Sequence, residues 1–321
     1  MESLRAAPDL HELSARDLEA CRAKLRGGSR SFHLASKLLP APIADGATCL
    51  YAFCREADDA IDLATRPPDA LERLRERLAD AYRGRPQDSP VDRAFAVVVR
   101  AADVPRALPD ALLEGMLWDA EGRRYESLGD VRAYSARVAA AVGAMMSVLM
   151  GGRSEETLAR ACDLGVAMQL SNIARDVGED ATLGRVYLPL EWLADADIDV
   201  ERWLAEPVFS DRLGSVVLRL LDEADRLYAR AAPGISDLPA RCRFGIHSAA
   251  RVYASIGHAV RRNGGDSISR RAVVSAAGKL SCLPPAAWGA LTSGARSSAP
   301  CLPETRFLVD AARLGSEVGH G

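Results

Sequence analysis

Residues 165–189 read GVAMQLSNIARDVGEDATLGRVYLP and form the most informative stretch of the chain. Gln169, Asn172, Asp176 and Asp180 recur at intervals of three and four residues, which places them on one face of an α-helix. The positions between them include the apolar residues Val166, Met168, Leu170, Ile173 and Val177. A helix that is apolar around most of its circumference belongs inside a protein, and buried carboxylates are costly unless something neutralises them. The stretch therefore predicts a polar stripe that faces a buried cavity and needs a neutralising partner.

The composition is typical of a helical globular protein. The chain has 321 residues, of which 48% are hydrophobic, 26% charged and only 5% aromatic. These proportions allow a buried core and favour helix over sheet. The net charge of −3 comes from interspersed acidic and basic residues without a basic block, which argues against nucleic-acid binding.

No segment has the pattern of an export signal or a membrane span. The first twenty residues are charged and lack the apolar core of a signal peptide. The longest nearly apolar run, 138–150, is too short to cross a bilayer. The seven cysteines show no CxxC spacing and the five histidines form no zinc motif. We therefore expect reduced thiols in a cytoplasmic protein.

Hydrophobic periodicity and proline or glycine breaks predict an all-α protein, with no alternation of strands and helices. The predicted helices cover residues 9–27, 43–63, 68–83, 90–102, 107–121, 128–150, 154–180, 197–205, 210–232, 238–263 and 271–283. We expect one all-α domain over residues 1–285, ended by Pro284-Pro285, and a loose C-terminal tail over 286–321. A short final helix near 303–314 is an option within that tail.

The predicted helix at 51–62, YAFCREADDAID, carries two aspartates one turn apart. Asp58 and Asp62 share a face with Arg55, which lies one turn before the first of them. Such a pair is common on the solvated face of a helix and means little alone. The pair is more informative here because the rest of the helix is largely apolar.

The stretch 172–180 repeats this pattern, because Arg175 directly precedes the pair Asp176 and Asp180. Like charges four residues apart destabilise a helix by a few tenths of a kcal/mol unless something neutralises them. Mg²⁺ prefers oxygen ligands and is typically held by one or two carboxylates together with substrate phosphates. Two such helices facing each other could hold Mg²⁺ ions and a diphosphate leaving group, with the adjacent arginines neutralising the remaining phosphate charge.

Further motifs add to this pattern at matching separations. They are GSRSF (28–32), CREADDAID (54–62), Tyr134-Ser135 with the small-residue run 138–143, and the stretch 164–189 with its Arg185, Tyr187 and Pro189. Over roughly residues 20–285 the chain resembles the squalene/phytoene synthase family of head-to-head prenyl transferases. The resemblance implies an isoprenoid-synthase (terpenoid synthase) fold, a helical bundle around a central cavity.

The resemblance also implies roles for individual residues around that cavity. Metal ions would be held by Asp58, Asp62, Asn172, Asp176 and Asp180. Phosphate or substrate contacts would come from Arg30, Arg55, Gln169, Arg175 and Arg271, although Arg270 is an alternative to the last of these. The catalytic set would be the four aspartates together with Tyr134 and Tyr253, the two tyrosines lying near the reacting carbons. The prenyl chains would contact Phe32, Ala139, Val142, Gly143 and Met146.

The residues alone leave other interpretations of these side chains open. Both tyrosines, Phe32 and Met146 are also consistent with ordinary core packing. Arg30 is also consistent with a solvated loop, and the small residues 139–143 with close packing of two helices.

The implied reaction is the condensation of two molecules of geranylgeranyl diphosphate, with Mg²⁺ as the cofactor and Mn²⁺ as the alternative ion. It would proceed through prephytoene diphosphate to phytoene and released diphosphate, the first committed step of carotenoid biosynthesis. Because the substrate and product are lipids, peripheral contact with a membrane and with a carotenoid desaturase is expected.

Two departures from the family pattern bear on substrate length. Ser36 and Ala136 stand where some relatives have aromatic residues, which favours the longer prenyl chain. A squalene or dehydrosqualene synthase acting on farnesyl diphosphate remains an alternative. Two further alternatives are non-catalytic. One is a helical homologue that acts as an assembly factor, and the other is an acidic helical bundle that binds a partner. Both complete DxxxD motifs argue against a non-catalytic role.

Overall fold

The computed structural model describes residues 8–28, 30–292 and 299–314, without the side chains of residues 30–32 and 314. Its described residues form helices and no strand, as the sequence predicts. The helices are α1 (Ala15–Gly28), α2 (Arg30–Ser36), α3 (Ala41–Asp62), α4 (Pro67–Tyr82), α5 (Pro90–Ala101), α6 (Ala107–Ala120), α7 (Leu128–Ser135), the π-helical turn η1 (Ala136–Ala140), α8 (Ala141–Leu149), α9 (Glu155–Thr182), α10 (Leu190–Asp195), α11 (Val200–Ala205), α12 (Asp211–Ala231), the 3₁₀ turn η2 (Ala232–Asp237), α13 (Ala240–Arg262), α14 (Ala276–Ser281), α15 (Leu283–Thr292), the 3₁₀ turn η3 (Pro303–Thr305) and α16 (Arg306–Leu314).

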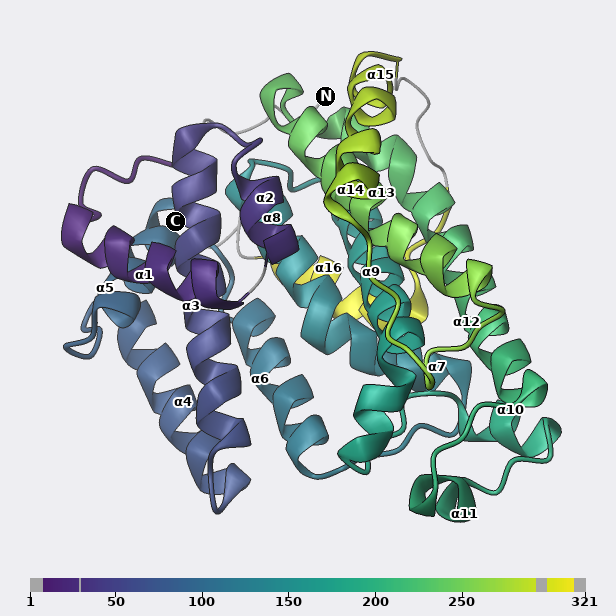
Figure 1. Ribbon diagram of the computed structural model, residues 1–321. Helices are drawn as coiled ribbons and strands as arrows, with labels where there is room; N and C mark the ends of the chain where they lie inside the picture. The colour runs from purple at the N-terminus through teal and green to yellow at the C-terminus, as the bar shows by residue number, and fades with distance from the viewer. Residues whose placement is uncertain (1–7, 29, 293–298, 315–321) are drawn as a thin grey trace.

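Helix α9, which carries the polar stripe, runs through the middle of the bundle (Figure 1). It packs against α7, α8, α12, α13, α16 and the short turns η1 and η2. Its start follows from the sequence, because the Ser154 side chain accepts a hydrogen bond from the Thr157 amide and two glutamates occupy the first turn. Val166, Leu170 and Ile173 are buried, which confirms that this helix lies in the interior.

Two glycines let α9 and the α7–α8 segment approach until their backbones touch. A Cβ atom on Gly165 would lie 2.6 Å from the Cα of Ala140, and one on Gly143 would lie 2.6 Å from the carbonyl oxygen of Ala161. The segment opposite Gly165 is the π-helical turn, which interrupts the single helix predicted over 128–150. Helical periodicity does not reveal this turn, because the residues on both sides of it remain helical.

Replacing Gly165 with alanine is expected to lower the free energy of unfolding by about 1–3 kcal/mol, because the new methyl group meets backbone atoms that cannot move aside. The matched control is Gly27→Ala in α1, where a Cβ atom meets nothing within 4 Å. This control should raise the free energy of unfolding by up to about 1 kcal/mol through helix propensity. Urea unfolding followed by circular dichroism checks both; equal values for the two variants would contradict the close contact.

The C-terminal region differs from the prediction. Residues 271–275 are not helical, and Pro284 and Pro285 lie in the first turn of α15 instead of ending a helix. Proline is tolerated there because the first-turn amides need no partner within the helix. The segment 286–321, expected to be loose, contains most of α15 and the predicted final helix, α16. Leu308 and Val309 of α16 are fully buried, because the apolar residues of this helix share one face. Residues 293–298 and 315–321 of the predicted tail lie outside the described part.

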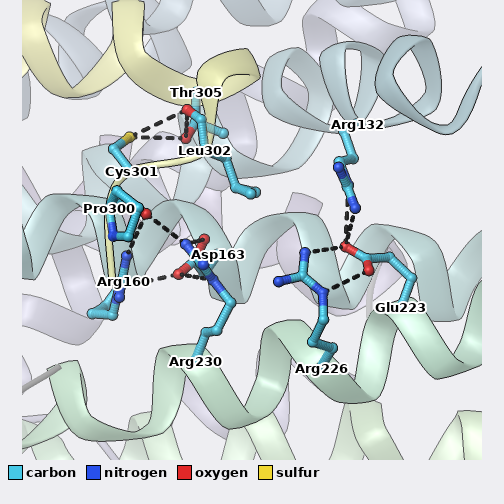
Figure 2. A network of polar contacts seen from close by, with 10 residues as sticks. All are labelled: Arg132, Arg160, Asp163, Glu223, Arg226, Arg230, Pro300, Cys301, Leu302 and Thr305. Carbon is cyan, nitrogen blue, oxygen red and sulfur yellow. Dashed lines mark hydrogen bonds and ion pairs between the residues drawn. The ribbon is translucent and has the colours of Figure 1, made fainter. Parts of the chain in front are cut away.

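A buried ionic network ties this C-terminal segment to the bundle (Figure 2). The Asp163 carboxylate is fully buried and lies 3.0 Å from Nε of Arg160 and 3.2 Å from Nε of Arg230. Arg230 also donates a hydrogen bond to the carbonyl oxygen of Pro300 at 2.7 Å. Asp163 therefore neutralises two arginines where α9, α12 and the C-terminal segment meet.

Candidate active site

An internal cavity of about 400 Å³ lies among α2, α3, α6, α8, α9 and α13. Most of its wall is apolar, and its polar residues include Arg55, Asp58, Gln169 and Asn172. The predicted site residues that line it are Arg55, Asp58, Ala139, Val142, Gly143, Met146, Gln169, Asn172 and Tyr253. The structure therefore brings part of both acidic helices and the small-residue segment to one cavity. The side chains of Arg30 and Phe32 lie outside the described residues.

Helix α3 presents the first aspartate pair. It begins after Pro40, with another proline in its first turn, and buries Ile43 and Phe53 in the core, which leaves Asp58 at the cavity. The Asp58 carboxylate lies 3.0 Å from Arg55 Nη1. Burial and the neighbouring charge of Asp62 raise the pKa of Asp58, and Arg55 only partly offsets them.

Helix α9 presents the second pair, one and two turns beyond Asn172. Arg175 and Arg271 each place Nε 2.7 Å from the Asp176 carboxylate. Burial alone would raise the pKa of Asp176, but the hydrogen bonds from these two arginines outweigh it, so the pKa is lowered. Arg270 instead donates to the side chain of Asn263. Of the two adjacent arginines, it is therefore Arg271 that reaches the acidic helix.

Asp180 differs from the other three aspartates of the two pairs, each of which forms an ion pair with an arginine. It forms no ion pair among the residues that the structure describes, and burial, followed by the charge of Asp176, raises its pKa to about 7. The charge of Arg185 lowers the pKa of both Asp180 and Asp58, and its Nη2 lies 3.4 Å from Asp62. Arg185 therefore lies between the two aspartate pairs, in a polar region that we call the mouth. Of the four aspartates, Asp58 lines the cavity itself, whereas Asp62, Asp176 and Asp180 are not among its lining residues.

A buried carboxylate that the sequence interpretation missed lies near this mouth. Asp119 of α6 accepts hydrogen bonds of 2.7 Å from the hydroxyl groups of Tyr134 and Tyr187. Burial raises its pKa to about 6, although both hydrogen bonds oppose the shift. Its charge in turn contributes to the raised pKa of Asp180. The available signal was a carboxylate at the end of the largely apolar run ALLEGMLWDA (111–120).

Tyr134 lies beside the cavity instead of lining it. Its ring packs between those of Tyr125 and Tyr187, with centroid distances of 5.1 Å to each, and its side chain is almost fully buried. The hydroxyl group points to Asp119, so this tyrosine reaches the polar mouth through that carboxylate. Its predicted catalytic role remains a prediction.

The two positions thought to control chain length differ in their placement. Ser36 lines the cavity wall, and its hydroxyl donates to the His33 carbonyl oxygen at 3.0 Å. Ala136 is fully buried at the start of the π-helical turn and is not among the lining residues. Of these two departures from the family pattern, only the one at Ser36 therefore changes the space inside the cavity directly.

These features match those of a known protein family. A family model described as squalene/phytoene synthase matches residues 25–277. The chain belongs to this family. It is 52% identical over 304 residues to a phytoene synthase of Rhodobacter capsulatus, covering 92% of this chain and 90% of that protein. It is 51% identical over 315 residues to a phytoene synthase of Cereibacter sphaeroides, covering 94% of this chain and 89% of that protein.

Solved structures show the same fold. A dehydrosqualene synthase in complex with a ligand aligns with a TM-score of 0.81 at 31% identity, covering 87% of this chain and 98% of that chain. A squalene synthase from Alicyclobacillus acidocaldarius aligns with a TM-score of 0.72 at 25% identity, covering 78% and 94% of the two chains. The predictions of an isoprenoid-synthase fold and of an enzyme in this family are confirmed. Both bacterial relatives are named for the predicted activity.

Proposed function

We propose that this chain is a phytoene synthase that condenses two molecules of geranylgeranyl diphosphate head to head. The first condensation releases diphosphate and a proton and gives prephytoene diphosphate. Loss of its diphosphate, rearrangement and deprotonation then give phytoene. This reaction is the first committed step of carotenoid biosynthesis. The observation that carries this proposal is the approach of both aspartate pairs to one arginine, Arg185, at a polar mouth where Asp58 lines the apolar cavity.

The donor atoms at the mouth fit Mg²⁺, with Mn²⁺ as the alternative ion. The proposed ligands, all oxygen donors, are Asp58, Asp62, Asn172, Asp176 and Asp180. Among the described residues no group of three or more His, Cys, Asp or Glu side chains is close enough to hold an ion alone. Pairs of carboxylates that share an ion with substrate phosphates are the usual arrangement for Mg²⁺. Bound Mg²⁺ would supply Lewis-acid activation of the diphosphate leaving group.

The arginines at the mouth are suited to exchange carboxylate for phosphate. Arg55, Arg175 and Arg271 already donate to aspartates there, and a guanidinium can donate two parallel hydrogen bonds to either type of anion. We propose that they bind the diphosphates, together with Arg30, which lies on α2. Once the aspartate ligands are neutralised, these arginines would stabilise the negative charge that develops on the departing diphosphate.

The apolar wall would hold the prenyl chains and keep water from the allylic cation. Ala139, Val142, Gly143 and Met146 line it, and Phe32 is proposed to join them. Gln169 and Tyr253 add polar atoms to the wall, and we propose that Tyr253 and Tyr134 lie near the reacting carbons. Because Gly143 lines the cavity and touches α9, the small residues serve both chain space and helix packing.

Incubating the purified protein with Mg²⁺ and either geranylgeranyl or farnesyl diphosphate, with and without NADPH, tests this proposal. Phytoene from the longer substrate is the expected product. Squalene or dehydrosqualene from farnesyl diphosphate alone would assign the chain to the shorter substrate. No hydrocarbon from either, in a folded protein, would favour a non-catalytic helical homologue.

Asp119→Asn is expected to lower kcat/KM about 10–100-fold, because the two tyrosine hydroxyls donate to different oxygens of the carboxylate and one of these becomes an amide nitrogen that cannot accept a hydrogen bond. The effect should fall mainly on kcat, since Asp119 is proposed to position Tyr134 and Tyr187 without touching substrate. The control is Asp110→Asn on the same helix, whose carboxylate pairs with Arg106. Steady-state assays with geranylgeranyl diphosphate measure both, and equal kinetics would contradict the positioning role.

A further inference from the structure

The surface formed by α14, α15 and the adjacent end of α2 concentrates exposed apolar side chains. Among the described residues nine large apolar side chains are exposed; four lie on these helices, and a fifth, Val273, lies three residues before α14. These five, which define the α14–α15 face, are Leu34, Val273, Leu280, Trp288 and Leu291. Trp288 is 70% and Leu291 84% exposed, and their spacing places them on one face of α15. Figure 1 shows α14 and α15 following one another along α13, at the end of the molecule away from α10 and α11.

An apolar groove of about 420 Å³ adjoins this face, between α2, α13 and α14. Leu34 and Leu280 belong to both the face and the groove wall. Ala35, Ala249 and Tyr253 line both the groove and the central cavity. The groove and the cavity therefore share a wall, and the α14–α15 face borders the groove on its outer side through Leu34 and Leu280.

The surface around this face carries mainly positive charge. Helices α2, α13, α14 and α15, which form the face and the groove, together contain arginines and lysines but no aspartate or glutamate. Lys37, Arg251 and Lys279 form no ion pair among the described residues, and Lys279 lines the groove. Lys37 and Arg251 directly adjoin the groove-lining residues Leu38 and Val252 in the sequence.

This combination fits one kind of partner. Exposed apolar residues clustered on a protein surface usually mark an interaction site. Tryptophan is enriched at the headgroup level of bilayers, and lysines can extend their charged ends into that layer. Each lysine or arginine near an anionic bilayer surface contributes enough attraction to strengthen binding roughly fivefold. A protein partner would supply the apolar contact, but nothing in an apolar protein surface would use the unpaired cations.

We propose that the α14–α15 face docks on the surface of an anionic lipid bilayer, with Trp288 and Leu291 at headgroup level. The adjoining groove would then be the path by which prenyl chains pass between the bilayer and the central cavity. Only this second part rests on the proposed function. None of the helices in the described part of the chain is long and apolar enough to cross a membrane, so contact through this face would be peripheral.

Vesicle binding by the full chain tests the docking. The probes are phosphatidylcholine vesicles with and without about 30% phosphatidylglycerol, a lipid that carries the anionic charge the proposal requires. Binding is expected only to the anionic vesicles. The double variant Trp288→Ser, Leu291→Ser should weaken it at least about tenfold, and Lys37→Gln with Lys279→Gln roughly fivefold per charge removed. The controls are Leu63→Ser, at a site 87% exposed, and Arg202→Gln on α11; both should bind like the unchanged chain.

The outcomes separate docking from catalysis. The double apolar variant should keep the unchanged turnover when substrate is supplied in detergent micelles and lose it when substrate is supplied in vesicles. Failure of the unchanged chain to bind anionic vesicles, or equal weakening by Leu63→Ser, would overturn the docking. Self-association lost in the double variant, without vesicle binding, would assign the face to a second copy of this chain and also overturn it. Absence of hydrocarbon product in micelles would refute the proposed function and leave the binding result standing.

Discussion

Asp180→Asn is expected to lower kcat/KM for geranylgeranyl diphosphate on the order of 10²–10³-fold, the loss typical when one electrostatic group is removed from a site that stabilises developing charge. Asparagine keeps the shape of the side chain but removes the negative charge. Asp180 forms no ion pair among the described residues, so the substitution breaks none of the ion pairs that the other three aspartates form with arginines. A steady-state assay with saturating Mg²⁺ measures the effect.

The same substitution should stabilise the metal-free protein. Burial and Asp176 raise the pKa of Asp180 to about 7 from the ordinary 3.8, so the folded state holds a proton that the unfolded state releases. The unchanged protein therefore loses stability as the pH rises between these two values, and asparagine avoids this loss. In the presence of a chelator, the stability gain of Asp180→Asn should be absent near about pH 4 and complete above about pH 7.

The matched control is Glu156→Gln, which removes one negative charge from an exposed position of the same helix that forms no ion pair among the described residues. It should retain activity close to that of the unchanged protein. Near-normal activity in Asp180→Asn would contradict the proposed metal site. Lower thermal stability in Asp180→Asn at about pH 8 would instead show that the carboxylate has a compensating partner in solution.

Asp163→Ala is expected to lower the free energy of unfolding by about 3–5 kcal/mol, because it leaves two arginines without their shared buried counter-ion. Arg160 and Asp163 are almost completely buried, so water cannot replace the lost interaction. Arg230 also holds the Pro300 carbonyl oxygen, so the C-terminal segment should become loose first (Figure 2). Chemical denaturation gives the free energy, and hydrogen exchange in α16 reports the local loosening.

Two further variants identify the cause of that loss. Asp222→Ala on α12 removes an exposed partner of Arg261 and should change stability by at most about 1 kcal/mol. Combining Asp163→Leu with Arg160→Met and Arg230→Met removes all three charges, and should recover most of the loss. If the triple variant were no more stable than Asp163→Ala, packing and not the uncompensated charge would be responsible.

The local features of this protein follow from short-range patterns. The spacing of Gln169, Asn172, Asp176 and Asp180 placed them on one helix face, and the apolar residues between them placed that helix inside. Most helix boundaries were predicted within a few residues, because prolines, capping residues and apolar periodicity act over one or two turns. The π-helical turn was missed because the residues on both sides of it remain helical. The path of the chain through Pro284 and Pro285 was missed because proline occurs both after the end of a helix and in the first turn of one.

The sequence by itself determined the all-α fold, the two aspartate pairs and the small-residue segment opposite them. Only the tertiary structure decided which distant residues complete the mouth. Asp119 joins Tyr134 to Tyr187, Arg271 reaches Asp176, and Arg185 lies between the two aspartate pairs. Each of these contacts depends on how helices cross, and side-chain periodicity along one helix carries no information about that. For the same reason, the polar stripe predicted a neutralising partner, whereas the fold showed that Arg175 of the same helix shares that role with Arg185 and Arg271.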